Sequence, residues 1–478
     1  MDPYYLGNRV MPMEGRGPHD KEPAGGKDTV IQWPETSLTK LRRVAIRAKE
    51  DRNLRFTSLG NLLDKVMLRE SWRRIRKDGA AGVDGITAKE YGLRLEDNLR
   101  NLYQRQRLNQ YQAPPVRRVW IPKVNGTLRP IGVPATEDKI LQRAVASIME
   151  VIFDPNFLDC SYGFRPGRNA HQAVEAIQKT LTFKPITWVL ELDIESFYDN
   201  LNHEWLRKMV NLRLGDGHLR RLIGKWLEAG VMQEAQLLKQ DKGSPQGGIV
   251  SPTLANIYLH CVLDVWFERK VKPTLKGQAY LWRYADDGLL AFEYEEDARK
   301  VLELLKLRIG KFSLKLNETK TRLLNFKKPE DGDGRGNPDG KPPTFDFLGF
   351  THYWGISRKG RAIVKRKTAA SRIRRAMSRM AEWCRRNRHE SLKRQQAHLN
   401  AALRGHYNYY GITGNWNSLQ GFFLHVVKVW KKWLGRRSQK GYIRWERMRG
   451  TLERYALEAP RVVHSIYRAP PRVCESLL

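Results

Sequence analysis

The sequence has few cysteines and no long apolar segment. The four cysteines stand far apart without a C-x-x-C pair, which suits a reducing compartment and offers no structural zinc site; they are Cys160, Cys261, Cys384 and Cys474. No run approaches the roughly 20 apolar residues needed to cross a bilayer, and the chain begins without the apolar core of a secretory signal. We therefore expect a cytoplasmic protein without membrane spans.

Acidic residues are scarce as well. The 478 residues include 51 Asp and Glu against 86 Lys and Arg, which gives a formal net charge of +35 and a pI near 10.1. Such an excess of positive charge calls for a strongly acidic partner, and nucleic acid fits best. A merely basic protein is the alternative, but 41% hydrophobic residues and 14 Trp indicate folded cores rather than a basic tail.

The order of composition along the chain suggests its organisation. Residues 1–35 are rich in Pro and Gly and predict a disordered leader, whereas apolar spacing over 36–112 predicts a helical N-terminal extension. A second stretch rich in Gly and Pro, 327–344, predicts an exposed hairpin loop or linker. Between these breaks, strand-like runs alternate with amphipathic helices. Beyond Phe350 we expect helices, and residues 358–394 contain 15 Lys and Arg against two acids.

Three carboxylates are candidates for chemistry. The segment 281–292 has two apolar stretches flanking Asp286 and Asp287, as in a β-hairpin with carboxylates at its tip. Such a pair alone is more often a solvated turn than a metal site. A second apolar run, 189–192, ends in Asp193. If the two strands are neighbours, the three carboxylates converge.

Converging carboxylates repel one another unless they bind cations. Hard oxygen ligands with open coordination positions suit Mg²⁺ together with substrate phosphates. Two Mg²⁺ ions roughly 3.5–4 Å apart would activate a primer 3′-hydroxyl and stabilise the leaving pyrophosphate. The pattern thus favours nucleotidyl transfer.

The segment Tyr284-Ala285-Asp286-Asp287 resembles the Y-x-D-D box of reverse transcriptases. Further motifs flank it in order along the chain: IPK (121–123), LRPIGVP (128–134), YGFRPGR (162–168), the Asp193 strand, GSPQGG (243–248), LNETKT (316–321) and FLGF (347–350). This series resembles the fingers and palm blocks of group II intron reverse transcriptases, and the likeness extends over about residues 38–468.

The resemblance implies an α+β right-hand polymerase fold. Its fingers and palm, with antiparallel sheet, would occupy 113–355 after the extension and start of the fingers at 36–112. A helical thumb would follow at 356–396 and a helical, RNA-binding maturase region at 397–468, with a tail at 469–478. The string LRGHYNYYG, which ends at Gly411, is the mark of the maturase region.

The same resemblance assigns roles around the carboxylates. Asp193 and Asp286 would be metal ligands, and Asp287 would complete the triad. Tyr198 would be the bulky aromatic residue that excludes a ribonucleotide by clashing with its 2′-hydroxyl, although ordinary palm packing is the alternative. Asp199 is left out, because its sequence context predicts that it caps a helix.

Other residues would contact the nucleotide. Lys123 and Arg129 flank Asn125-Gly126, which has the signature of a two-residue hairpin turn, and they would clamp the incoming triphosphate. Gln246, with Gly247 and Gly248, would let the backbone approach the templating base and nucleotide. Lys320 would meet a primer or nucleotide phosphate, with a solvated surface lysine as the alternative.

Basic residues interleaved with aromatics after the palm predict RNA binding, because rings stack on exposed bases and cations neutralise phosphates. Many of these aromatics must instead belong to a core. The candidate RNA contacts are Arg372, Arg374, Arg375, Arg385, Arg386, Arg388, Arg404 and Tyr407.

The resemblance implies an RNA-directed DNA polymerase that copies a group II intron RNA into DNA during retrohoming and assists its folding and splicing as a maturase. The partners would be intron RNA, an RNA template with a DNA primer, target DNA and deoxynucleoside triphosphates. We expect a monomer within a ribonucleoprotein of the bacterial cytosol or nucleoid. A splicing-only RNA-binding maturase, or a domesticated enzyme of DNA repair or phage defence, remains the alternative.

One departure from the family pattern concerns DNA cleavage. Many members continue into a DNA-binding region and an HNH-type nuclease with paired cysteines, and this sequence shows neither before Leu478. We therefore expect no cleavage of the target strand by this chain, and priming from a 3′-hydroxyl made elsewhere.

Overall fold

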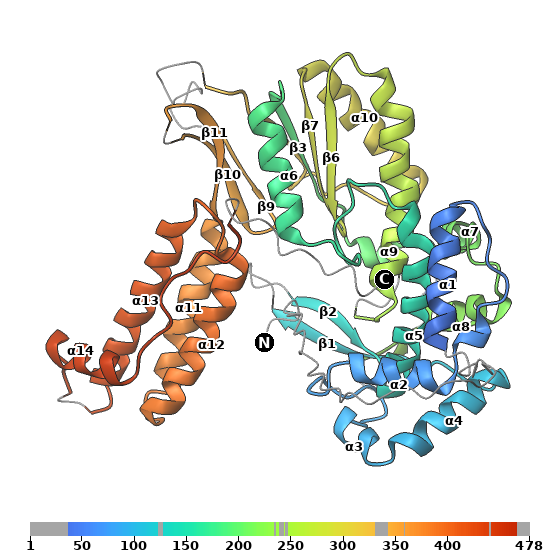
Figure 1. Cartoon of the computed structure of the whole chain (residues 1–478), viewed down its shortest axis with the longest axis horizontal. Coiled ribbons are helices and arrows are strands. Elements are labelled where there is room, and N and C mark those ends of the chain that lie inside the picture. Colours follow the sequence, from blue (N-terminus) through green and yellow to red (C-terminus); the bar gives the residue numbers. More distant parts are fainter. Residues whose placement is uncertain are drawn as a thin grey trace, which may run out of the picture. The chain divides into compact units, whose positions relative to one another are not determined.

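The computed structural model describes residues 37–122, 128–233, 236–238, 243, 247–329, 343–357, 359–438 and 441–465. Over these ranges the protein mixes helices with three β-sheets (Figure 1). The predicted leader, and residues 330–342 of the predicted loop, lie outside the described residues. In the described part of the chain, no helix is long and apolar enough to span a membrane.

The described chain opens with helices, as predicted for 36–112. They are α1 (Ser37–Glu50), α2 (Lys65–Arg74), α3 (Ala88–Leu93) and α4 (Leu95–Arg107). The Asp64 side chain caps α2 by accepting from the Met67 amide at 2.9 Å, and Thr87 caps α3 with Glu90 in a reciprocal pair. The apolar faces of these helices share one core with α5 (Thr136–Phe153) and with helices later in the chain. The N-terminal helices are therefore packed as part of the largest hydrophobic core of the described residues.

The first sheet has the order β2-β1-β4-β5 and contains β1 (Val116–Pro122), β2 (Leu128–Val133), β4 (Val231–Gln233) and β5 (Gln236–Leu238). The predicted hairpin is confirmed, since β1 and β2 pair antiparallel. The two-residue turn predicted at Asn125-Gly126 falls on residues that the structure does not describe. Residues 123–127, including Lys123, lie outside the described residues.

The second sheet has the order β6-β7-β3-β8 and is antiparallel throughout. Its strands are β3 (Trp188–Leu192), β6 (Ala279–Tyr284), β7 (Asp287–Phe292) and β8 (Arg322–Asn325). The hairpin predicted over 281–292 is confirmed, and so is its pairing with the strand that ends at Asp193.

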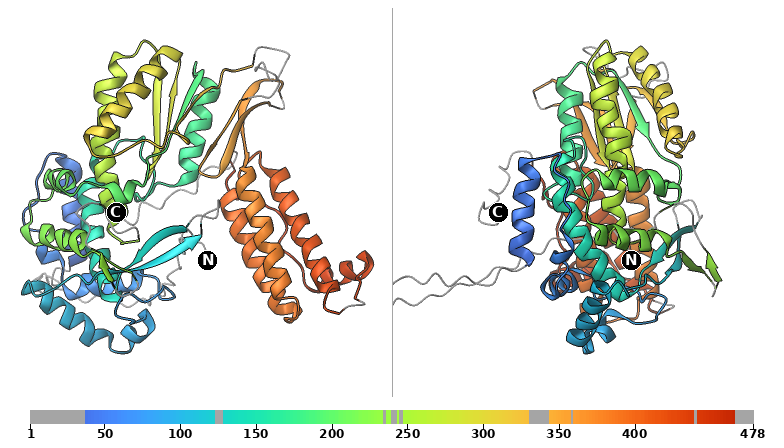
Figure 2. Two further views of the ribbon diagram at one scale, coloured as in Figure 1. Left: turned by 180° about the vertical axis from the view of Figure 1, so that it is seen from behind. Right: turned by 90° about the vertical axis from the view of Figure 1, so that its right-hand side faces the viewer.

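Both faces of this sheet are covered, which explains why its strands read as continuous apolar runs. Leu190 and Phe292 point into the core that includes α9 (Ser251–Leu259) and α10 (Glu295–Lys311). Val189 and Leu289 point into a second core with α6 (Ala170–Phe183). The ribbon of α6 lies against this sheet (Figure 1, Figure 2). The alternation follows from the two-residue period of a strand. Two further helices, α7 (His203–Asn211) and α8 (Gly217–Glu228), follow β3.

The third sheet corrects the expectation that the chain becomes helical beyond Phe350. Its strands are β9 (Thr344–Phe347), β10 (Phe350–Ile356) and β11 (Ala362–Thr368), in the order β11-β10-β9. Leu348 and Gly349 join β9 to β10 with φ of 50° and 80°, as a tight primed turn requires. Val364, Arg366 and Thr368 are buried in alternation, so this basic segment has the period of a strand.

Helices resume at Ala370 and form a third core of their own. They are α11 (Ala370–Arg386), α12 (Leu392–Tyr410), α13 (Trp416–Gly435) and α14 (Trp445–Arg454). The predicted thumb therefore starts with strands, and the predicted boundary between 396 and 397 falls inside α12. Tyr407 is fully buried in this core, so the prediction that its ring stacks on RNA is wrong.

The buried position of Tyr407 gives a testable expectation. Its ring fills the core of the bundle and its hydroxyl donates to the Glu458 carbonyl at 3.1 Å. Tyr407→Ala should lower the free energy of unfolding by roughly 3–5 kcal/mol, because it leaves a cavity. The control Tyr407→Phe should cost only about 1 kcal/mol, since it removes one hydrogen bond. Denaturant titration measures both, and equal stability of the two variants would contradict this packing.

Candidate active site

A strained turn carries the paired acids. Ala285 and Asp286 connect β6 to β7, and the pair formed by Tyr284 and Asp287 closes the turn. Ala285 has φ of 57°, in the left-handed region that a residue with a Cβ adopts only at a cost. Contacts around the turn must hold it in this conformation.

The strand register brings the third acid to the same place. Leu192 of β3 pairs with Gly288 of β7, so the next step of the ladder sets Asp193 opposite Asp287. The backbone of Asp193 is fixed, because its carbonyl accepts from the Asn317 amide at 2.9 Å. The three predicted carboxylates thus lie at one end of the sheet.

The electrostatics of the site agree with this proximity. Desolvation by the surrounding protein, and then the charges of Asp286 and Asp193, raise the pKa of Asp287 to about 7, although water still reaches the residue. Desolvation also raises the pKa of Asp286, with Arg129 opposing it. The folded state binds the Asp287 proton more tightly than the unfolded chain does, because the pKa is higher in the folded state. The free energy of unfolding therefore decreases as pH rises from about 4 to 7 and this carboxyl ionises. A cation at this point would relieve that cost.

The donor set fits a divalent cation in an open site. In the described ranges, no group of three or more His, Cys, Asp or Glu side chains lies close enough together to hold a metal ion by itself. Mg²⁺ in sites that handle nucleotides usually takes one or two carboxylates and completes its coordination with water and substrate phosphates. Three neighbouring carboxylates match that mode of binding and not a closed protein cage.

Two predicted cations lie beside the carboxylates. Lys320 donates to both carboxylate oxygens of Asp193 at 3.2 Å while most of its side chain remains exposed. Arg129 on β2 is close enough to lower the pKa of Asp286. Both cations therefore lie close enough to the carboxylates to act on their charge.

Tyr198 lies in a short 3-10 turn, Phe197–Asn200, and its ring packs edge-on against Phe197 with 5.3 Å between centroids. It is partly exposed, which is compatible with both predicted roles. Asp199 is not the cap of the following helix. That duty belongs to Asn202, which accepts from the Trp205 amide at 3.0 Å.

The glycines of the GSPQGG segment pack against the protein's own backbone. Gly243 has φ of 96°, and a Cβ there would lie 2.8 Å from the Asp199 carbonyl oxygen. At Gly247, with φ of 121°, a Cβ would lie 2.3 Å from the Gly132 carbonyl oxygen. Glycine thus lets this segment contact the Tyr198 turn and β2. Gln246 lies outside the described residues.

The YGFRPGR segment, to which the sequence assigned no role, supports the acidic turn. The Tyr162 amide donates to the Arg283 carbonyl at 2.8 Å. A Cβ on Gly163 would lie 2.4 Å from the Ala285 nitrogen, so glycine is required for this approach. The sequence signal for this role is a glycine next to an aromatic residue. The residue that Gly163 packs against, Ala285, is distant in the chain, so the sequence alone does not show the contact.

The predicted RNA contacts divide into different environments. Arg372 lowers the pKa of Asp287 and so lies near the carboxylates. Arg385 and Arg386 both pair with Glu382, at 2.9 and 2.5 Å, while Arg404 pairs with Glu458 at 2.9 Å. The side chain of Arg388 donates to the Arg385 carbonyl at 3.0 Å, and Arg374 is exposed beside Arg375, which is partly buried.

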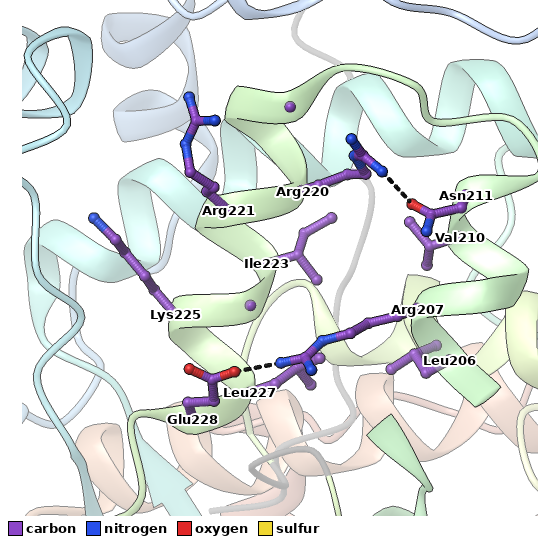
Figure 3. Close-up of a pocket in the computed structure, with 12 residues that line it drawn as sticks. Leu206, Arg207, Val210, Asn211, Arg220, Arg221, Ile223, Lys225, Leu227 and Glu228 are labelled. Carbon is purple, nitrogen blue, oxygen red and sulfur yellow. Dashed lines mark hydrogen bonds and ion pairs between the residues drawn. The ribbon is translucent and has the colours of Figure 1, made fainter. Parts of the chain in front are cut away.

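A hollow of about 480 Å³ lies apart from the acids, between α7 and α8 (Figure 3). Arg207 pairs with Glu228 across it, and Arg220 donates to Asn211 at 3.3 Å. The hollow is also lined by Arg221 and Lys225, so Glu228 is the one acid among its described charged lining residues. A basic lining is expected of any hollow on a protein with net charge +35, so the hollow identifies no chemistry by itself.

Comparisons with known proteins agree with this geometry. The family described as "Reverse transcriptase (RNA-dependent DNA polymerase)" matches residues 121–352. Protein YkfC of Escherichia coli K12 is 34% identical over 322 residues, which cover 59% of this chain and 83% of YkfC. The group II intron-encoded protein LtrA of Lactococcus lactis subsp. cremoris is 30% identical over 353 residues, covering 61% of this chain and 58% of LtrA.

A telomerase from Candida albicans, solved in complex with a fragment of telomeric RNA, is a looser match. Its TM-score is 0.42 with 12% identity, over 77% of this chain and 65% of the telomerase chain. A score this low adds nothing to the comparison. The agreement with known proteins rests instead on the relatives found by sequence. The chain spans 83% of YkfC and 58% of LtrA.

Proposed function

This chain belongs to the reverse transcriptase (RNA-dependent DNA polymerase) family, and we propose on that premise that it copies RNA into DNA at the carboxylate end of the β6-β7-β3-β8 sheet. The observation that carries the proposal is the register of β3 against β7, which sets Asp193 opposite Asp287 and next to Asp286. Acids that converge in this way suit the transfer of a nucleotide to a 3′-hydroxyl.

The chain's own residues have distinct duties in this reaction. Asp193, Asp286 and Asp287 would hold two Mg²⁺ ions together with the nucleotide phosphates, and the ions would supply activation of the primer hydroxyl and stabilisation of the leaving pyrophosphate. Arg129 and Lys320 would draw the triphosphate towards the acids, and Lys123 and Gln246 are proposed as further contacts. Tyr198 would exclude ribonucleotides.

The finer arrangement is also part of the proposal. The sheet of β1 and β2 would form the fingers, the β3-containing sheet the palm, α11 the thumb, and α12 to α14 the maturase region. Because LtrA is named as encoded by a group II intron, we propose such an intron as the RNA partner. The exposed arginines of α11 and α12 support binding of folded RNA by their charge.

The carboxylates give the first test. Replacing Asp193, Asp286 or Asp287 by Asn should reduce DNA synthesis by several orders of magnitude, because the charge as well as the shape of the site is needed. Folding should survive, since Asn has the same size. Primer extension on poly-rA with oligo-dT measures synthesis. Full activity in the Asp286→Asn, Asp287→Asn double variant would disprove the assignment.

Tyr198 gives a second test. Tyr198→Ala should incorporate rGTP more readily relative to dGTP, because a steric barrier to the 2′-hydroxyl is removed. Affinity for primer and template should stay the same, and Tyr198→Phe serves as the control that keeps the ring. An unchanged ratio of rGTP to dGTP incorporation would instead assign Tyr198 to packing.

The charged face of α11 gives a third test. Neutralising Arg385 and Arg386 with Gln should weaken binding of structured RNA and flatten its dependence on salt, by about 0.7–0.9 in the logarithmic slope for each lost phosphate contact. Short primer extension should suffer less. Glu382→Gln is the matched control, because it releases both arginines and should preserve or strengthen binding. An unchanged slope in the arginine variant would exclude this face from the RNA interface.

A further inference from the structure

A fully buried ion pair lies directly behind the acidic turn. Arg283 is the fifth residue of β6, is 1% exposed, and comes just before Tyr284. Its Nε and Nη2 atoms donate to the two carboxylate oxygens of Asp264, each at 2.7 Å, and Asp264 is 0% exposed. Burial would raise the pKa of the Asp264 carboxyl, but the facing Arg283 lowers it on balance.

Every remaining donor of the guanidinium is also used. Nη1 donates to the Asn256 side-chain oxygen and to the Ala285 carbonyl, both at 2.9 Å, and Nη2 donates to the Ser161 hydroxyl at 2.8 Å. An arginine has five N–H groups, and these five bonds satisfy all of them in a fixed plane. The side chain is therefore held without rotational freedom.

The network contacts the turn through two different groups. On one side Arg283 binds the carbonyl of Ala285, the residue with φ of 57°. On the other side Asn256 donates to the Gly163 carbonyl at 2.8 Å, and Gly163 packs against the Ala285 amide. The strained conformation of Ala285, which sets the direction of the Asp286 side chain, is thus fixed by groups from three separate parts of the chain.

Stability alone does not account for this network. Removing two charges from water costs several kcal/mol for each ion, and apolar residues of similar volume often stabilise a protein as well or better. Asp264 also ends a π-helical turn, His260–Asp264, a geometry that is less stable than a regular helix and is frequent at functional sites. The cost is explained if the network holds the acids in place.

We propose that Arg283, Asp264 and Asn256 are positioning residues that lock the Ala285-Asp286 turn and thereby aim the Asp286 carboxylate. The proposal rests on the proposed polymerase function for its effect on rate. It assigns to the buried arginine, and to the YGFRPGR segment beneath the turn, a duty separate from binding nucleotide, primer or template.

The decisive variant replaces the pair by apolar residues, as Arg283→Met with Asp264→Leu. No charge is left unpaired, so the fold should survive. The unfolding midpoint should fall, because the Asn256 side-chain oxygen, the Ala285 carbonyl and the Ser161 hydroxyl lose their Arg283 donor. The bond to the Ala285 carbonyl is lost, so the single-nucleotide incorporation rate should fall on the order of 10²-fold, as displacements of about 1 Å at a reacting group do. The KM for dNTP and the affinity for primer and template should not change.

Arg283→Lys provides a second variant that keeps the buried charge. A single ammonium cannot reproduce the planar fork that joins Asp264 to Ala285, so the rate should again fall. The matched control is Arg213→Met. Arg213 is also buried and donates to the backbone carbonyls of Ala48, Asp51 and Ile152, none of which belongs to the acidic turn. Arg213→Met should lower the free energy of unfolding. The single-nucleotide incorporation rate of the folded fraction should stay the same.

Hydrogen exchange at the turn separates the possible outcomes. Amides of residues 285–287 should exchange faster in both Arg283 variants and not in Arg213→Met. A folded double variant with an unchanged rate and unchanged exchange would overturn the proposal, as would a change confined to the KM for dNTP. If the unmodified chain fails to extend any primer, the polymerase function is disproved, while the exchange measurement still shows whether the network holds the turn.

Discussion

Repulsion among Asp193, Asp286 and Asp287 is the constraint on which the rest of the described structure depends. Three carboxylates meet at one end of a sheet, and the pKa of Asp287 is raised to about 7 as a result of desolvation and of its two neighbours. An arrangement of this kind does not persist unless the backbone around it is held firmly. The covered faces of the β6-β7-β3-β8 sheet, the fixed Asp193 carbonyl and the close packing of Gly163 supply that support.

Features that depend on neighbouring residues could be predicted from the sequence. The hairpin of β6 and β7 follows from apolar runs on both sides of Asp286, and its pairing with β3 follows from a second apolar run that ends in an acid. Both signals are local, because a strand buried on two faces leaves an uninterrupted apolar run. The motifs around the acids were recognisable for the same reason.

Features that depend on burial could not be predicted. In β11, Lys and Arg conceal an alternation of buried residues, since Arg366 itself points inward, and the segment was expected to be helical. Tyr407 has the sequence context of a ring that stacks on RNA, yet the bundle buries it. The network around Arg283 joins it to Asp264, 19 residues away, and to Ser161, 122 residues away, and neither spacing leaves a periodic trace.

The helix α12 has a mechanical consequence. Its 19 residues form one uninterrupted rod of about 28 Å at 1.5 Å per residue. At its end, the Tyr409 carbonyl accepts from His171 of α6 at 2.7 Å, and the Tyr409 hydroxyl donates to the Leu348 carbonyl at 2.8 Å. A continuous helix anchored in this way moves as one body and does not bend like a hinge. A displacement of the helical bundle would therefore also displace the turn between β9 and β10.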